Sequence, residues 1–399
     1  MGPAARVLVV DDASQAPEPV AKVVAATGAE LHRRAANGGP AAARNSGLAL
    51  CRTPFVAFVD SDCVPEPGWL ARLLPHFADP MVAAVAPRVI GLDPPGWLGR
   101  YEQARSSLDL GARPGPVQPR SRIAYVPAAA LVVRRAALGS GFSERLRVGE
   151  DVDLVWRLHA AGWRIRYEPA ARVRHQHRVT FRQWAGRKYA YGTSAGPLAA
   201  RHPGHLPPAV TSIAAALPLA LLRSGRPRSA AVAAGLSAAG LARRLPAFPG
   251  RFREAARLVV TGTATTAYGL ASAATRAWLP VTLGLLIWCP GARRTLLSGV
   301  VAVPTLAWCA RRPRQDPLRW ALTYLFDDAC YCAGLWAGAV RARTAAPLLP
   351  AVPEFTTIVP GNLPGRSIKK GAGHDNADTG GQSATGGRNG RGHQHRRCG

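Results

Sequence analysis

The chain has 399 residues and a formal net charge of +28. Its length predicts a catalytic core with an appended region rather than one domain. Residues 1–200 hold 26 Lys and Arg against 16 Asp and Glu, and the remainder holds 25 against 7. The basic excess favours contact with polyanions, such as phosphorylated substrates or anionic lipids. Zinc-finger spacing, an aromatic RNA-binding signature and a basic heptad helix are all missing, so we expect no nucleic-acid partner.

Cysteine spacing and the first residues bear on the compartment. The seven cysteines are dispersed and form no zinc-ribbon, redox or disulfide pattern. The sequence begins without a charged leader and apolar run, so no secretory signal is expected. We therefore expect an active site on the cytoplasmic side.

The sequence divides into three regions that differ in composition and in hydrophobic pattern. Residues 1–205 alternate short apolar runs with helical stretches, which predicts an α/β domain. The apolar runs at 7–10 and 55–59 are continuous, as in strands covered on both faces, and each ends in aspartate. Residues 206–350 are rich in Ala, Leu and Arg. Residues 351–399 lack hydrophobic periodicity, resemble a frame-shifted extension, and are expected to be disordered.

The apolar stretches of the second region are short. They cover residues 209–222, 229–241 and 278–288, whereas spanning a bilayer takes about 20 residues. Such stretches favour helices that lie in the membrane interface, form re-entrant hairpins or pack on one another. We expect a helical, membrane-associated region at the cytoplasmic face of the cell membrane. An ordinary soluble helical appendage is the alternative.

Two aspartates follow the second buried run. In an extended segment, residues i and i+2 point to the same side, so Asp60 and Asp62 can face one site. Mg²⁺ and Mn²⁺ are held by one or two carboxylates together with substrate phosphates and water. The motif therefore predicts a site for a divalent cation and a diphosphate, with a solvated turn as the alternative.

The first buried run also ends in acids. Asp11 and Asp12 could accept hydrogen bonds from a nucleobase or a ribose, although Asp12 and Ser14 are also good helix caps. A Gly-rich turn follows at residues 37–47 and leads into a helix of small residues. Arg44 on that helix can meet a phosphate or an acidic partner with two hydrogen bonds.

A third acidic group opens a predicted helix. Glu150, Asp151 and Asp153 fall within four positions, followed by a helical apolar pattern that ends at Gly162. The helix dipole explains one acid near its N-terminus. Three acids suggest that one carboxylate acts as a general base toward an acceptor hydroxyl. His175, at the end of a predicted strand over 165–173, could complete a metal site or could be a surface histidine.

Four motifs in order carry a family resemblance. Residues 9–14, 37–47, 58–62 and 149–154 together resemble family 2 glycosyltransferases of the GT-A fold. The resemblance covers about residues 6–200. It implies a Rossmann-like nucleotide-sugar-binding domain, a divalent cation, and transfer that inverts the sugar carbon.

The resemblance also assigns roles to residues. Asp151 would be the catalytic base, with Glu150 beside it, and residues 125–135 would form the acceptor-side strand. Contacts to the nucleotide sugar and the neighbouring acceptor site would come from Asp11, Asp12, Arg44, Asn45, Asp60 and Asp153. The metal ligands would be Asp60, Asp62 and His175.

Later residues narrow the resemblance. Residues 187–193 and 316–336 resemble the branch of the family that elongates a glucose chain on a peptide-derived redox cofactor, which implies UDP-glucose as donor. Such domains begin with a strand and a helix ahead of the strand that ends at Asp11, so we expect an N-terminally truncated domain. A catalytically inactive membrane-surface scaffold that retains the fold is the alternative function.

Overall fold

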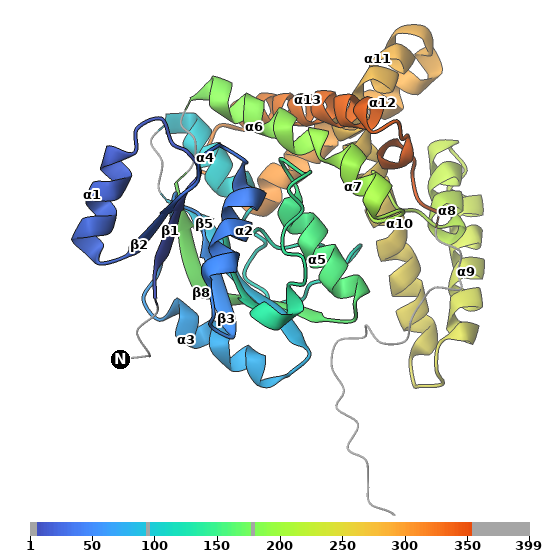
Figure 1. Ribbon diagram of the computed structural model, residues 1–399. Helices are drawn as coiled ribbons and strands as arrows, with labels where there is room; N and C mark the ends of the chain where they lie inside the picture. The colour runs from blue at the N-terminus through green and yellow to red at the C-terminus, as the bar shows by residue number, and fades with distance from the viewer. Residues whose placement is uncertain (1–5, 93–95, 177–179, 353–399) are drawn as a thin grey trace, which may run out of the picture. The chain divides into compact units, whose positions relative to one another are not determined.

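The structure is a computed structural model that describes residues 6–92, 96–176 and 180–352, all within one compact unit (Figure 1). From residue 353 onward the predicted tail lies outside the described residues, so its disorder stays a prediction. The predicted boundary at residues 205 and 206 falls between two helices. Packing crosses it, because helices from both sides share buried clusters.

The strands form two sheets. β1 (Leu8–Asp11) and β2 (Glu30–Arg33) run parallel as a pair of their own. The larger sheet has the order β3-β7-β5-β8-β4, with β6 paired to β8. Within it β5 and β8 are parallel and the other pairs are antiparallel. The strands of this mixed sheet are β3 (Phe55–Val59), β4 (Cys63–Pro65), β5 (Val82–Gly91), β6 (Gly115–Pro116), β7 (Ala130–Arg134) and β8 (Arg164–His175).

Along the chain, helices lie before, between and after the strands of the large sheet. Those of the catalytic region are α1 (Glu18–Thr27), α2 (Pro40–Leu50), α3 (Trp69–Leu73), α4 (Gly96–Arg105), α5 (Glu150–Ala160), α6 (Phe181–Thr193) and α7 (Ala195–Arg201). Those of the helical region are α8 (Ile213–Arg223), α9 (Pro227–Arg244), α10 (Arg251–Arg276), α11 (Leu279–Trp288), α12 (Pro290–Arg311) and α13 (Pro317–Arg341). Three short 3₁₀ turns are η1 (Leu74–Ala78), η2 (Arg135–Ala137) and η3 (Ala346–Leu348).

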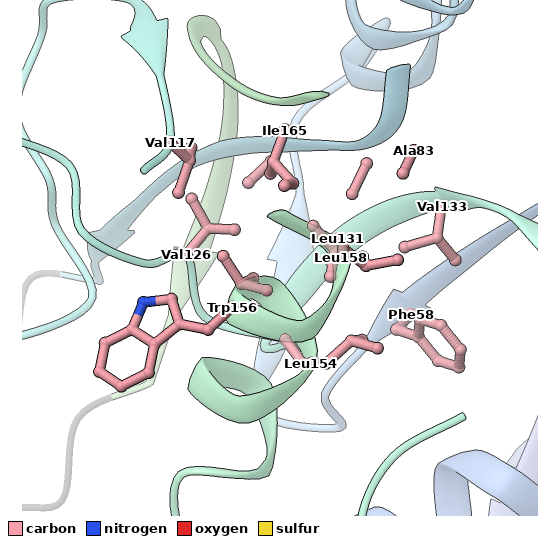
Figure 2. Close-up of a cluster of buried hydrophobic side chains, with 14 of the residues drawn as sticks. Phe58, Ala83, Val117, Val126, Leu131, Val133, Leu154, Trp156, Leu158 and Ile165 are labelled. Atoms are coloured by element: carbon pink, nitrogen blue, oxygen red, sulfur yellow. The ribbon is translucent and has the colours of Figure 1, made fainter. Parts of the chain in front are cut away.

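The main core lies between the large sheet and α5. Leu154 and Leu158 of α5 face Leu131 of β7 in Figure 2, and all are buried. Trp156 is also buried, and its indole N–H donates to the carbonyl oxygen of Ala124 at 2.8 Å. Burying each such side chain contributes about 1.5–3 kcal/mol. The apolar stripe of α5 thereby holds its acidic first turn at one edge of the sheet.

One expectation about strand burial is wrong. The run at residues 55–59 does form β3, but its residues alternate between buried and exposed, and Val59 is 39% exposed. β3 is the terminal strand of the large sheet, with β7 on one side only. The run at residues 7–10 is not fully buried either, since Val7 is 57% exposed, so neither run is covered on both faces as predicted.

Glycines join the catalytic and helical regions. Gly192 and Gly196, on α6 and α7, meet Gly334 and Gly338 of α13. A Cβ atom built on Gly334 would collide with the carbonyl oxygen of Tyr189, and one on Gly196 would collide with that of Gly338. Small residues spaced four apart allow helix backbones to touch in this way. The helices therefore meet backbone to backbone.

Buried ion pairs reinforce the same junction. Arg105 of α4 donates to Asp327 at 2.8 Å and to Asp328 at 2.9 Å, both on α13. Lys188 of α6 lies 3.4 Å from Asp327, and Arg276 of α10 donates to Asp328 at 3.0 Å. Both aspartates are at most 2% exposed. Removing one member of such a buried network costs about 3–5 kcal/mol.

The helical region exposes many apolar side chains. On α11, Ile287 is 61% exposed and Trp288 is 77% exposed. Among the described residues, no single helix is both long enough and apolar enough to cross a membrane. α10 and α11 together pass that test by length and composition, but they meet at a bend of 93°.

Candidate active site

The first acidic motif is a tight turn between β3 and β4. The N–H of Asp60 donates to Ala129 at 2.9 Å, which ties the end of β3 to β7. The carbonyl oxygen of Asp60 accepts the N–H of Cys63 at 2.9 Å and closes the turn. The carboxyl groups remain accessible, with side-chain exposures of 39% for Asp60 and 41% for Asp62. Both aspartates can therefore meet a ligand.

β-Sheet pairing brings His175 to this turn. Cys63 on β4 is opposite His175 on β8, and the N–H of Gln176 donates to the carbonyl oxygen of Asp62 at 2.8 Å. The Nε2 atom of His175 lies 3.4 Å from a carboxylate oxygen of Asp62. The structure therefore brings together two of the three predicted metal ligands, which are 113 residues apart in the chain.

Arg44 connects the first acidic motif to the third. Its guanidinium donates to Asp60 at 2.7 Å and to Glu150 at 2.6 Å. Burial opposes its charge, but the two carboxylates outweigh burial and raise the pKa of Arg44. Arg44 projects from α2, where Ala41 and Ala42 are almost fully buried. These small residues allow the helix to lie close enough for the arginine to reach both acids.

Asp151, in the first turn of α5, is hydrogen-bonded to the same segment that anchors Asp60. One of its carboxylate oxygens accepts the N–H of Ala128 at 3.2 Å, and Ala129 is the residue bonded to Asp60. Burial raises the pKa of Asp151 despite opposing contributions from Arg44 and from two backbone N–H groups. Burial and the charge of Asp151 likewise raise the pKa of Glu150. A carboxylate with a raised pKa is suited to accept a proton near neutral pH.

Two other predicted site residues have structural partners instead. Asp153 is fully buried, and its carboxylate accepts hydrogen bonds from Arg157, Arg201 and His202. Burial opposes its ionisation, but these hydrogen bonds prevail and lower its pKa. Asp153 therefore fastens α5 to the end of α7, and its role in the acceptor site stays a prediction.

Asn45 likewise holds a loop. Its side chain bonds both the carbonyl oxygen and the N–H of Phe142, at 2.9 and 2.8 Å, and reaches Glu144 at 2.8 Å. The loop it fixes leads toward Gly149, whose φ of 83° turns the chain into α5. The described contacts of Asn45 thus support the position of the third acidic group rather than a ligand.

The acids after β1 organise a loop. Asp11 accepts the N–H of Ser14 at 3.0 Å and pairs with Arg33, and the Ser14 hydrogen bonds lower its pKa. Asp12 accepts the N–H groups of Gly38 and Gly39, at 3.0 and 2.7 Å. Asp12 therefore holds the Gly-rich turn that starts α2. The capping alternative is wrong, because α1 begins at Glu18 and its N-terminal cap position is Pro17. The nucleoside role stays a prediction.

A cavity beside His175 adds residues that sequence reasoning missed. It is lined by Glu102, Ser106, Ser107, Leu108, His175, Trp184, Arg187, Lys188 and Tyr191. Lys188 is 5% exposed and pairs with Glu102 at 2.7 Å. Residues 187–193 carry a family resemblance, but their sequence pattern does not predict a cavity. No local pattern marks Glu102, whose partners lie on α6.

The side chains of the site supply only some of the ligands that a divalent cation needs. Within the described residues, no group of three His, Cys, Asp or Glu side chains could hold a metal by itself. Asp62 and His175, with Asp60 two residues away, supply an oxygen-rich half-site. Mg²⁺ and Mn²⁺ commonly take their remaining ligands from water and substrate phosphates. The residues therefore suit a cation that arrives with a diphosphate.

Comparisons with known proteins identify the class. The family model described as Glycosyl transferase family 2 matches residues 2–139. Two bacterial proteins are 43% identical to the chain over 361 residues, which is 87% of this chain and 77% of theirs. The chain therefore belongs to glycosyl transferase family 2, and its mixed sheet with flanking helices is a GT-A-type fold.

Both of these relatives are named pre-mycofactocin glycosyltransferase, from Mycobacterium tuberculosis strains CDC 1551 / Oshkosh and ATCC 25618 / H37Rv. They confirm the predicted resemblance of the chain to the mycofactocin-system glycosyltransferase. The succinoglycan biosynthesis protein ExoU of Rhizobium meliloti strain 1021 is 32% identical over 180 residues, covering 40% of this chain and 50% of its own. A mannosyltransferase structure from Pyrobaculum calidifontis, in complex with GDP-Man and Mn²⁺, covers 83% of this chain and 78% of its own at 17% identity. The TM-score of this comparison is 0.37.

Proposed function

We propose that the protein transfers a hexose, glucose, from a nucleoside diphosphate sugar to an acceptor hydroxyl, with inversion, in mycofactocin glycosylation. One observation carries the chemical part of this proposal. Asp60 and Asp151 are bonded to the neighbouring residues Ala129 and Ala128, and Arg44 bridges Asp60 to Glu150. Acids from two distant motifs therefore share one site. The similarity to the pre-mycofactocin glycosyltransferases supports the pathway.

The donor side is formed by the turn after β3. Asp62 and His175, with Asp60, would hold a divalent cation, Mg²⁺ or Mn²⁺, together with the diphosphate. Such a cation supplies Lewis-acid stabilisation of the negative charge on the departing nucleoside diphosphate. Arg44 keeps Asp60 and Glu150 close without direct repulsion, because its guanidinium lies between them. Asp11 and Asp12 remain the candidates for the nucleoside.

Asp151 acts as the base. The acceptor hydroxyl gives its proton to a carboxylate oxygen of Asp151 while its oxygen attacks the anomeric carbon. The bond from that carbon to the diphosphate oxygen breaks on the opposite face, so the configuration inverts. The raised pKa of Asp151 favours this proton transfer, because a base works best when its pKa is near the working pH.

The partners follow from the relatives and from the surface. UDP-glucose is the proposed donor, and a hydroxyl of a peptide-derived redox cofactor is the proposed acceptor. We also propose that the helical region lies on the cytoplasmic face of the cell membrane. Residues 206–315 contain fourteen arginines and one acid, Glu254, and α11 exposes Ile287 and Trp288. Each basic residue near an anionic bilayer contributes about 1 kcal/mol.

Substitution of the base tests the proposal. Asp151→Asn keeps the shape of the side chain but removes the proton acceptor, so transfer is expected to fall by about 10²–10⁴-fold. UDP release from UDP-glucose with Mn²⁺ and an extract of the peptide-derived acceptor measures this loss. Titration calorimetry with UDP and Mn²⁺ should give similar affinities for the variant and the parent.

Glu18→Gln is the matched control, because Glu18 lies exposed at the start of α1. It should leave transfer unchanged. Equal transfer by Asp151→Asn and the parent contradicts the assigned base. A parent chain that neither binds UDP-glucose at millimolar concentration nor releases UDP would support the inactive scaffold instead.

A further inference from the structure

The cavity beside His175 joins the proposed donor site to one face of α6. His175 lines it from the end of β8, and Trp184, Arg187, Lys188 and Tyr191 line it from α6. These four positions of α6 are three or four residues apart, so they lie on one side of the helix. A ligand held at His175 therefore has this face of α6 beside it.

Lys188, one of the two cations on this face, is neutralised by carboxylates. Its ammonium group lies 2.7 Å from Glu102 and 3.4 Å from Asp327. Glu102 also accepts the indole N–H of Trp184 at 2.7 Å. Lys188 and Trp184 thus fix α6 to α4 and α13, and the charge of Lys188 is balanced before any ligand arrives.

Arg187, the other cation on this face, is not balanced in this way. Its side chain is exposed, and within the described parts of the chain it forms no ion pair. Its guanidinium lies over the ring of Tyr191, 5.5 Å from the centroid. An arginine that lies over an aromatic ring keeps N–H groups free to donate at its edge. Arg187 therefore brings both a positive charge and hydrogen-bond donors to the cavity that His175 lines.

The arginine within the acidic cluster cannot supply that charge. Arg44 already donates to Asp60 at 2.7 Å and to Glu150 at 2.6 Å. Asp62 and His175 supply only part of the ligands of a cation that comes with a diphosphate. An arginine can meet two oxygens of one phosphate at once, which suits Arg187 to an anion bound next to that half-site.

α6 holds Arg187 in a fixed place. Thr180 caps the start of the helix by accepting the N–H of Gln183 at 3.4 Å. Near the other end, Gly192 lies so close to α13 that a Cβ atom on it would collide with the carbonyl oxygen of Tyr331. A donor that is already in position stabilises developing charge without a cost of rearrangement.

We propose that Arg187 is a further catalytic residue, which binds the terminal phosphate of the nucleoside diphosphate and stabilises it as it leaves. When the bond from the anomeric carbon to the phosphate oxygen breaks, the electron pair stays on that oxygen, and Arg187 donates to the phosphate that carries it. The proton of the acceptor hydroxyl passes to Asp151, so Arg187 exchanges no proton. The inference rests on the proposed function, which places the diphosphate beside Asp62 and His175.

Transfer by variants of Arg187 tests the catalytic part. Arg187→Gln removes the charge and keeps an exposed polar side chain. The rate of UDP release at saturating UDP-glucose, with Mn²⁺ and an extract of the peptide-derived acceptor, should fall by about 10²–10³-fold, as for the loss of one preorganised donor. Arg187→Lys keeps a positive charge and should recover at least about a tenth of the parent rate.

Arg182→Gln is the matched control, because Arg182 is exposed on the same helix and lies outside the described lining of the cavity. It should transfer at the parent rate. A parent rate in Arg187→Gln would overturn the inference and leave the proposed function intact. An equal loss in Arg187→Lys and Arg187→Gln would also overturn it, because the charge would then not matter.

Binding provides a readout that does not depend on turnover. Titration calorimetry compares UDP with UMP, each with Mn²⁺, because UMP lacks the terminal phosphate. Arg187→Gln should weaken UDP binding about tenfold or more, the loss expected for a hydrogen bond to a charged group, and leave UMP binding unchanged. Equal UDP affinities for Arg187→Gln and the parent, or equal losses for UDP and UMP, would overturn the inference.

The same titration separates this inference from the proposed function. A parent chain that binds UDP but releases none from UDP-glucose contradicts the proposed function. A loss of UDP affinity in Arg187→Gln, with UMP affinity kept, would still support the phosphate contact in that chain. A parent chain that binds no UDP with Mn²⁺ overturns both.

Discussion

Aspartates serve opposite purposes in the catalytic and helical regions. In the catalytic region, Asp60 and Asp62 are partly exposed at a strand end, and burial raises the pKa of Asp151. In the helical region, Asp327 and Asp328 are buried and paired with cations from three other helices. Burial also opposes the charge of Asp327, but Lys188 and Arg105 outweigh it and lower its pKa. The groups that surround an aspartate, more than the residue type itself, therefore determine whether it is suited to catalysis or stabilises packing.

The largest expected effect comes from removing Arg105, the cation of the buried network that bonds both aspartates. Arg105→Leu leaves Asp327 and Asp328 without their shared partner. The free energy of unfolding should fall by about 3–5 kcal/mol, because uncompensated buried charges are costly. Urea denaturation followed by circular dichroism measures the change. A loss below about 1 kcal/mol would show that the network does not lock the two regions.

The pH profile of transfer tests Asp151, the proposed base of the catalytic region. Asp151 must be ionised to accept a proton, so kcat/KM should fall about tenfold per pH unit below its pKa. Because that pKa is raised, the fall should begin above the ordinary aspartate value of about 4. Initial rates between pH 4 and 9 provide the measurement. An acid limb centred at or below pH 4 would contradict the raised pKa.

The two pKa shifts also predict opposite effects on stability. The raised pKa of Asp151 means that its contribution to stability is present at low pH and is lost as the pH rises through the folded-state value. The lowered pKa of Asp327 means that its contribution is present above the unfolded value and is lost on acidification. Thermal unfolding of Asp151→Asn at pH 8 should therefore show a Tm no lower than that of the parent.

A smaller effect is expected at the apolar surface of the helical region. The double substitution Leu283→Asp and Ile287→Asp places charges on exposed positions of α11. Binding to vesicles that contain phosphatidylglycerol should fall about tenfold in a sedimentation assay, because apolar burial and charge attraction both weaken. Val23→Asp, on an exposed position of α1, is the control and should bind as the parent does. Equal binding by the double variant would remove α11 as the contact.

The smallest effect is expected at an exposed ion pair. Arg257 and Glu254 pair on the surface of α10, with side-chain exposures of 63% and 37%. Arg257→Leu should change the free energy of unfolding far less than Arg105→Leu does, because solvent screens such pairs. The same urea titration compares it with Arg105→Leu. Similar losses for both variants would erase the distinction between buried and surface pairs.

The sequence could predict the acidic motifs but not all of their neighbours. Asp60 and Asp151 follow local signals, a strand end and a helix start, and the fold brings those signals together. Asp153 lies only two residues beyond Asp151, yet its partners Arg201 and His202 come from the end of α7. Contacts set by tertiary packing leave no trace in a four-residue motif.

Strand pairing shows the same limit. The apolar runs at residues 7–10 and 55–59 predict strands, and both exist as β1 and β3. β1 and β3 belong to separate sheets because they pair with different strands. The residues of neither run determine which strand will pair with it. The composition predicted the helices of residues 206–350. It did not predict the cavity that Ala195, Leu206, Arg276, Leu335 and Pro347 line, because the walls of that cavity come from five separate segments.

The touching glycines of α6, α7 and α13 have a consequence for related chains. Where two backbones meet at Gly192, Gly196, Gly334 and Gly338, an added methyl group on one helix has no room unless its partner moves away. Substitutions at these positions should therefore occur in pairs across the junction during evolution. A helical region taken from another enzyme would fit this catalytic region only if it brought its own matching small residues.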